Sequence, residues 1–113
     1  VCVAGDGDFL MYPQELATAA QYGARLVVLI VNNGIYGTIR MHQERRFPGR
    51  VSATGLAAPD FVGLAQSFGA YAERVETTEA FAPAFERALA ADTSAVLELR
   101  VDPKQITPDR RIE

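Results

Sequence analysis

The sequence predicts an α/β domain with a mainly parallel sheet and flanking helices. Two apolar strings, at residues 1–4 and 26–31, lack the polar-apolar alternation of half-exposed strands. Such strings are typical of parallel strands that are covered on both faces. Helical patterns alternate with the predicted strands along the chain, which favours a parallel sheet with right-handed crossovers.

The first two helices follow from their boundary residues and apolar spacing. Residues 13–22 begin with a proline and stop before Gly23, as helices often do. Residues 61–68 place apolar side chains at i, i+3, i+4 and i+7, with Asp60 as a possible cap. Both segments are therefore predicted to be helices with one buried face.

The second half of the chain predicts two strands and a third helix. The strands are expected at 71–75 and 95–101, and the polar tail after them is expected to be peripheral. The helix starts near Thr78 or, because Pro83 lacks a backbone N–H, nearer Phe81. Four phenylalanines are assigned to the core: Phe61, Phe68, Phe81 and Phe85.

Length and composition fit one globular domain. The chain has 113 residues, of which 49% are hydrophobic and 22% charged, and its net charge is −3. About two-thirds of the unfolded surface can be buried at this size, so a single core is feasible. This composition excludes collagen, coiled coils and disorder, and the longest apolar run is far shorter than the roughly 18 residues of a membrane span. The weak negative charge gives no reason to expect nucleic acid or a membrane as a partner.

A long segment between the predicted elements indicates where a ligand could bind. Residues 32–59 show little periodicity apart from a short helical turn around 38–43. Compact domains seldom keep such loops without a use. In open α/β sheets, ligands bind beyond the carboxyl ends of the strands, where Asp6 and Asn33 are predicted to lie. These two residues should be neighbours if their strands are adjacent.

The residue types at these two strand ends favour magnesium and diphosphate. Asp6 follows Gly5 on a tight turn whose glycines allow a phosphate to approach, and the next helix offers its N-terminus to an anion. Asn33 offers a carboxamide oxygen on a second turn, followed by backbone carbonyls. Mg²⁺ takes oxygen ligands, of which only one or two are usually protein carboxylates. The two turns together therefore predict a Mg²⁺-diphosphate site.

Other interpretations of these residues fit less well. A dinucleotide-binding G-x-G-x-x-G motif would need a glycine at Leu10, and a calcium-binding loop would need Gly at Met11 and Glu at Ala17. Either Asp6 or Asn33 alone would be interpreted as a turn former, and only their pairing favours a site.

The single cysteine and single histidine exclude an internal disulfide and the usual four-ligand zinc site. Cys2 is expected to be a small buried hydrophobe in the first strand. The cytoplasm is the expected compartment.

The motif Gly5-Asp6-Gly7, followed by Asn32-Asn33, resembles the cofactor signature of thiamine diphosphate-dependent enzymes. The spacing fits as well, since Asn33 lies 27 positions after Asp6. The similarity continues through 14–19, 36–40, the helix that follows Pro59, and the last strand. Within this superfamily the chain looks most like the acetolactate synthase and benzoylformate decarboxylase group.

The resemblance implies specific roles. Asp6, the Asn33 side chain and the backbone carbonyl of Ile35 would ligate Mg²⁺. The cofactor thiamine diphosphate would be held by the Gly5, Asp6, Gly7, Asp8 and Phe9 segment and by Asn33, Ile35, Tyr36 and Gly37. Among these, Tyr36 and Gly37 would line the far end of the diphosphate.

The resemblance also implies what lies elsewhere. The glutamate that activates the cofactor belongs to a separate N-terminal domain, usually of the partner subunit, and none of Glu15, Glu44, Glu73, Glu76 and Glu79 matches it. The catalytic residues therefore stay unknown. Residues 1–113 would be the C-terminal part of the diphosphate- and Mg-binding domain of a larger homodimeric or homotetrameric enzyme, and would be inactive alone.

The implied reaction decarboxylates a 2-oxo acid and forms or cleaves the adjacent carbon-carbon bond, as in acetolactate synthase. A non-catalytic α/β diphosphate-binding or regulatory module is the alternative.

His42 stands where acetolactate synthases usually carry an aromatic residue, so it either faces the substrate mouth or is a solvated loop histidine. A basic cluster near it either attracts anionic substrates or forms a solvated face or subunit contact: Arg40, Arg45, Arg46 and Arg50.

Overall fold

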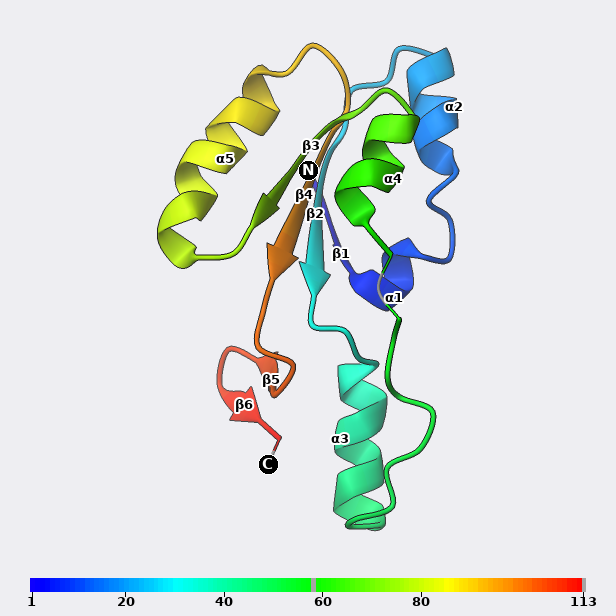
Figure 1. The fold of residues 1–113 in the computed structure, drawn as a ribbon, viewed down its shortest axis with the longest axis vertical. Helices are drawn as coiled ribbons and strands as arrows, with labels where there is room; N and C mark the ends of the chain where they lie inside the picture. Colours follow the sequence, from blue (N-terminus) through cyan, green and yellow to red (C-terminus); the bar gives the residue numbers. More distant parts are fainter. Residues whose placement is uncertain (58, 113) are drawn as a thin grey trace.

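A four-stranded parallel sheet forms the centre of the molecule in our computed structural model, which describes residues 1–57 and 59–112 (Figure 1). The strand order is β1-β2-β4-β3. The bounds are β1 Cys2–Gly5, β2 Val27–Asn32, β3 Tyr71–Val75 and β4 Ala95–Arg100. The predicted α/β class and the parallel sheet are confirmed, and the first two strands are neighbours as expected.

Helices cover both faces of this sheet. The bounds are α1 Asp6–Phe9, α2 Glu15–Gln21, α3 Gly37–Arg46, α4 Phe61–Ser67 and α5 Thr78–Ala90. Leu16 of α2 and Phe61 of α4 pack with Ile30 in one core cluster, and α5 packs on the other face through Ala84 and Ala88. Of the four phenylalanines predicted for the core, Phe61 is fully buried and the other three are half-buried against the two clusters.

The first strand differs from the prediction. We expected residues 1–4 to be buried on both faces, and Cys2 to be buried, but Cys2 and Val3 are exposed. The reason is that β1 lies at the edge of the sheet, and only β2 pairs with it in the described residues. The apolar string therefore predicted a strand correctly and its burial incorrectly.

The third predicted helix begins at the earlier of its two expected starts. The Thr77 hydroxyl accepts a hydrogen bond from the Ala80 amide at 3.4 Å and caps α5, which continues through Pro83. Pro83 is exposed, while Ala84 beside it is buried. Because packing of the buried face stabilises the helix, the missing hydrogen bond at Pro83 is tolerated.

The segment after β2 is more ordered than its weak periodicity predicted. The helical turn expected at 38–43 is the ten-residue helix α3, which projects beyond the sheet in Figure 1 and has no buried residue. The chain then returns over the turn after β2, where Gly55 forms an antiparallel bridge with Ile35.

The tail forms a small hairpin of β5 Gln105–Thr107 and β6 Arg110–Arg111. Ile112 at its end is buried, so the tail packs more closely than a peripheral segment would. In the part of the chain that the structure describes, no helix has the length and apolar character needed to cross a membrane.

Candidate functional site

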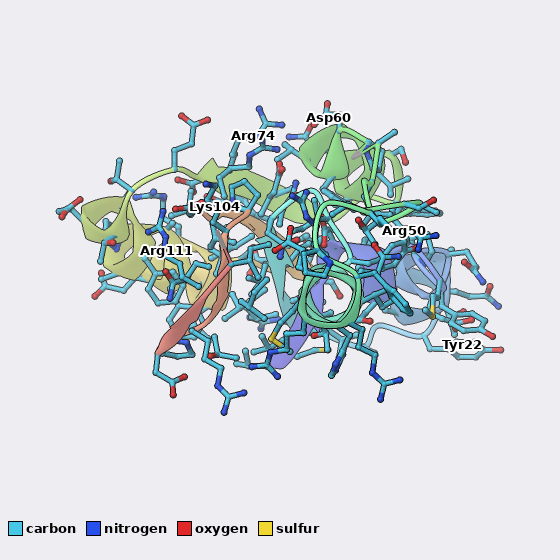
Figure 2. All side chains as sticks on the ribbon, turned by 90° about the horizontal axis from the view of Figure 1, so that it is seen from below. Tyr22, Arg50, Asp60, Arg74, Lys104 and Arg111 are labelled. Atoms are coloured by element: carbon cyan, nitrogen blue, oxygen red, sulfur yellow. The ribbon has the colours of Figure 1, made fainter. Side chains whose placement is uncertain are left out.

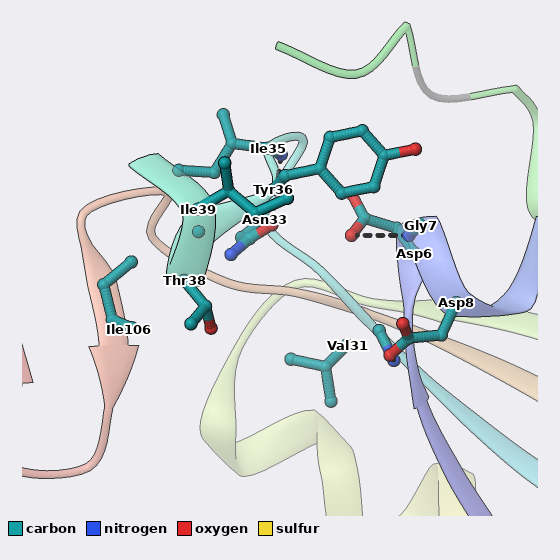
Figure 3. A pocket seen from close by; sticks show the side chains of 12 residues that line it. Asp6, Gly7, Asp8, Val31, Asn33, Ile35, Tyr36, Thr38, Ile39 and Ile106 are labelled. Atoms are coloured by element: carbon teal, nitrogen blue, oxygen red, sulfur yellow. Dashed lines mark hydrogen bonds between the residues drawn. The ribbon is translucent and has the colours of Figure 1, made fainter. Parts of the chain in front are cut away.

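A pocket of about 360 Å³ lies at the carboxyl ends of β1 and β2 (Figure 3). Both turns singled out in the sequence contribute to it. Its walls come from the β1–α1 junction, the end of β2, the start of α3 and the tail hairpin. The lining residues are Gly5, Asp6, Gly7, Asp8, Val31, Asn33, Ile35, Tyr36, Gly37, Thr38, Ile39 and Ile106.

Asp6 anchors one side of the pocket. It is the first residue of α1 and is only 3% exposed. Its Oδ1 accepts a hydrogen bond from the Gly7 amide at 3.0 Å, and its Oδ2 accepts one from the Gly34 amide at 2.8 Å. A carboxylate oxygen has two acceptor positions, so each oxygen of Asp6 retains one for a further partner.

Asn33 and Ile35 form the opposite side. The Asn33 Oδ1 accepts a hydrogen bond from the Ile35 amide at 3.1 Å, which is an Asx turn, and the Ile35 carbonyl accepts one from Gly37 at 3.0 Å. Gly34 between them has a φ of +70°, a conformation that glycine adopts readily. The Asn33 Oδ1 and the Ile35 carbonyl oxygen each keep a second acceptor position for a further partner.

Gly7 is required by close packing. A Cβ atom at this position would lie 2.6 Å from Cε1 of Tyr36 and 3.3 Å from Cδ1 of Leu56. Gly7 therefore allows α1 and the turn after β2 to approach each other.

Of the other two residues predicted to bind the cofactor, Asp8 lines the pocket and Phe9 does not. The exposed Asp8 lines the pocket and accepts a hydrogen bond from the Gly5 amide at 3.2 Å, which fixes the start of α1. The Phe9 ring packs instead on Phe61, with ring centroids 5.9 Å apart, in the core. Phe9 could thus meet a ligand only through its backbone.

The oxygen donors of the pocket suit a hard cation whose remaining ligands are phosphate and water oxygens. Among the described residues, no group of three or more His, Cys, Asp and Glu side chains is placed to hold a metal. The pocket lining instead offers oxygen donors of several kinds, among them the Asp6 carboxylate, the Asn33 carboxamide and the backbone carbonyl of Ile35. Mg²⁺ accepts such a set when phosphate and water complete its shell, so these residues fit the cation.

Sequence reasoning missed several lining residues. Thr38 and Ile39 belong to the first turn of α3, whose extent was underestimated, and Val31 lies within β2. Ile106 comes from the tail hairpin, where no local sequence signal marks it. Thr38 and Ile39 could have been found from the sequence, because α3 begins soon after the Asn32-Asn33-Gly34 turn that was already assigned to the site.

His42 and the basic cluster lie outside the pocket lining. His42 is exposed on α3, and therefore belongs to a helix rather than a loop. Arg40 forms an ion pair with Glu44 one helical turn later, with Nε and Oε1 2.8 Å apart. Arg45, Arg46 and Arg50 are exposed.

The chain is similar to known thiamine diphosphate enzymes. The family profile "Thiamine pyrophosphate enzyme, C-terminal TPP binding domain" matches residues 1–99. The chain is 34% identical over 104 residues to a probable acetolactate synthase large subunit of Methanococcus aeolicus, with 91% of this chain and 17% of that protein covered. It is 38% identical over 103 residues to the acetolactate synthase large subunit of Parasynechococcus marenigrum, with 89% and 17% covered.

A solved structure agrees with these sequence relatives. The thiamine diphosphate-dependent 4-hydroxybenzoylformate decarboxylase of Rhodococcus jostii RHA1 matches with a TM-score of 0.81 and 36% identity, over 88% of this chain and 19% of that one. The chain thus spans less than a fifth of each of these relatives. By its matched residues and its fold, the chain belongs to the thiamine pyrophosphate enzyme family, as a C-terminal cofactor-binding domain.

Proposed function

We propose that this chain is the thiamine diphosphate- and Mg²⁺-binding part of an acetolactate synthase-like enzyme. The whole enzyme would decarboxylate a 2-oxo acid and form or cleave the adjacent carbon-carbon bond. The observation that carries the proposal is the hydrogen bond between the Gly34 amide and Asp6, which joins the two turns around one pocket.

Three oxygen donors would hold the cation: the Asp6 carboxylate, the Asn33 carboxamide and the Ile35 carbonyl. Their free acceptor positions and the lining of a common pocket support this assignment. When bound, the thiamine cofactor supplies a thiazolium carbanion equivalent that this chain's own side chains could not provide.

The diphosphate would lie between Gly5-Asp6-Gly7-Asp8 and the start of α3. Gly37, Thr38 and Ile39 line the pocket at the first turn of this ten-residue helix. The Gly37 amide donates to the Ile35 carbonyl, whereas the other first amides of α3 have no intrahelical partner and favour negative charge, so these would face the proposed diphosphate. Tyr36 would cover the far end.

The catalytic groups would come from outside this chain. The pocket supplies cation and phosphate ligands but no side chain assigned to proton transfer. The exposed edge strand β1 and the exposed side chains of Met11, Tyr12 and Tyr22, which are 63%, 70% and 76% exposed, support an assembly in which further protein covers these surfaces. We propose a homodimer or homotetramer of a longer chain.

Calorimetry on the whole enzyme tests the function. Thiamine diphosphate should bind only when Mg²⁺ is present, and Asp6→Ala should abolish this binding. Asp92→Ala is the matched control, because Asp92 is an exposed carboxylate outside the pocket. A folded wild-type enzyme without cofactor affinity would overturn the proposal and favour a non-catalytic module.

A further inference from the structure

A buried carboxylate lies on β4, the strand next to β2, whose end contributes to the pocket. Glu98 is on the central strand β4 and is 1% exposed. Its cross-strand neighbours are Ile30 on β2 and Arg74 on β3. A charged side chain in the middle of a parallel sheet is costly unless it is paired, so its partners indicate its role.

Three donors surround Glu98. Arg74 Nε donates to Oε2 at 2.8 Å, whereas Asn32 Nδ2 and Arg100 Nη1 donate to Oε1 at 2.7 Å and 3.3 Å. Burial acts to raise the pKa of Glu98, but the hydrogen bonds from Arg74, Asn32 and Arg100 outweigh it and lower the pKa. Glu98 is therefore an ionised carboxylate at neutral pH, and an ionised carboxylate only accepts hydrogen bonds.

This charge fixes the orientation of Asn32. Because Glu98 accepts only, the 2% exposed Asn32 must present its NH₂ group to it, and its Oδ1 then points the other way. That oxygen accepts a hydrogen bond from the Gly34 amide at 3.1 Å. The same amide donates to Asp6 at 2.8 Å.

A continuous set of contacts thus runs from the arginines to the pocket. Arg74 also approaches Asp60 at the start of α4, with Nη2 and Oδ1 3.4 Å apart, and Figure 2 shows these two residues side by side. Arg74 donates a hydrogen bond to Glu98, and Glu98 in turn accepts one from Asn32. Asn32 then accepts a hydrogen bond from Gly34 in the turn after β2. None of Glu98, Arg74 and Asn32 lines the pocket itself.

We propose that Glu98 and Asn32 form a positioning pair for the cation site. Glu98 orients the Asn32 carboxamide, which holds the Gly34 amide against Asp6 and thereby sets the separation of Asp6 from Asn33. The pair touches neither the cation nor the cofactor. This inference rests on the proposed function, because it assigns the Mg²⁺ ligands as above.

The first test measures Mg²⁺ affinity rather than turnover. Calorimetric titration of the whole enzyme with Mg²⁺, at saturating thiamine diphosphate, should show a Kd for Asn32→Ala about 10–100-fold above wild type, the usual cost of losing a group that orients metal ligands. Urea unfolding of the same sample establishes that the variant is folded.

A reversed pair keeps the test informative if the alanine variant fails to fold. Asn32→Asp alone places a second carboxylate against Glu98 and should weaken Mg²⁺ binding. Adding Glu98→Gln restores the hydrogen bond in the opposite direction, because the new side chain at position 98 donates its NH₂ group to the new carboxylate at position 32. The double variant should therefore recover at least about tenfold of the lost Mg²⁺ affinity, within the range expected for such orienting contacts.

A matched control separates positioning from general stability. Glu73 on β3 pairs with Arg87 of α5, on the other face of the same sheet. Glu73→Gln removes a more exposed carboxylate–arginine pair of the same sheet and should leave the Kd for Mg²⁺ unchanged. If the wild type binds Mg²⁺ and the folded Asn32→Ala variant binds it equally well, the positioning role is refuted and the proposed function stands. If wild type binds no Mg²⁺ with the cofactor, the proposed function fails, and the inference fails with it.

Discussion

The backbone amide of Gly34 donates to the carboxylate of Asp6 at 2.8 Å, across the ends of two adjacent strands. The parallel pairing of β1 with β2 brings these residues together, since Gly5 lies opposite Val31 in the sheet. The separation of the two turns is therefore set by backbone geometry as well as by side-chain contacts.

Gly7→Ala should destabilise the fold. The added methyl group would lie 2.6 Å from the Tyr36 ring, so the ring or α1 must move, and the free energy of unfolding should fall by about 1–3 kcal/mol. Tyr36→Ala in the same protein should restore part of this loss by making room. Urea unfolding of both single variants and of the double variant measures the coupling, and strictly additive effects would contradict it.

Gly34→Ala should weaken both the fold and Mg²⁺ binding. The residue has a φ of +70° with open space at the Cβ position, so strain rather than collision would reduce the unfolding free energy by about 1–2 kcal/mol. Gly34→Asn should lose less, because asparagine tolerates this conformation.

Gly49→Ala is the control for that series. Gly49 has a φ of +72° and equally open surroundings, but it lies outside the pocket. It should cost similar stability and leave the Mg²⁺ Kd unchanged. Equal effects of the two alanine variants on Mg²⁺ affinity would show that the Gly34 turn has no special role.

Stability should depend on pH through Glu73. Hydrogen bonds from Arg87 and then Tyr71 lower the pKa of Glu73 from its usual 4.5. A carboxylate with a lowered pKa in the folded state stabilises the fold above the unfolded pKa, and this contribution is lost as the pH falls through the folded value. The stability difference between wild type and Glu73→Gln should thus be largest above pH 4.5 and shrink below it, as measured by urea unfolding. A difference that stays constant on acidification would contradict the assignment.

His42→Phe distinguishes the two interpretations of this residue, a side chain at the substrate mouth or a solvated histidine, and should leave cofactor affinity unchanged. His42 is exposed on α3, beyond the first turn that lines the pocket, so the substitution leaves the proposed cation and diphosphate contacts intact. Competing 2-oxo acid acceptors supplied to the whole enzyme would report the preference through their product ratio. An unchanged ratio would favour a solvated histidine.

The sequence was sufficient to predict the parallel sheet and to place Asp6 and Asn33 together, because strand pattern and turn chemistry are local signals. It could not reveal that β1 is an edge strand, since an apolar string looks the same wherever its neighbours lie. Ile106 and Glu98 were out of reach for a related reason. Their roles depend on contacts with residues far away in the chain, namely Gly37 and Asn32.

Asp6 and Asn33, two of the three proposed cation ligands, follow the ends of the parallel strands β1 and β2, and the chain that connects these strands turns at the opposite end of the sheet. Gly23 in this connection is exposed, and among the described residues no heavy atom other than those of its chain neighbours lies within 4 Å of its Cβ position. A short flexible peptide or a fluorescent label could therefore be inserted there without spreading the two ligand-bearing turns apart. The same geometry makes this connection a place where related chains can differ in length and still assemble an unaltered pocket.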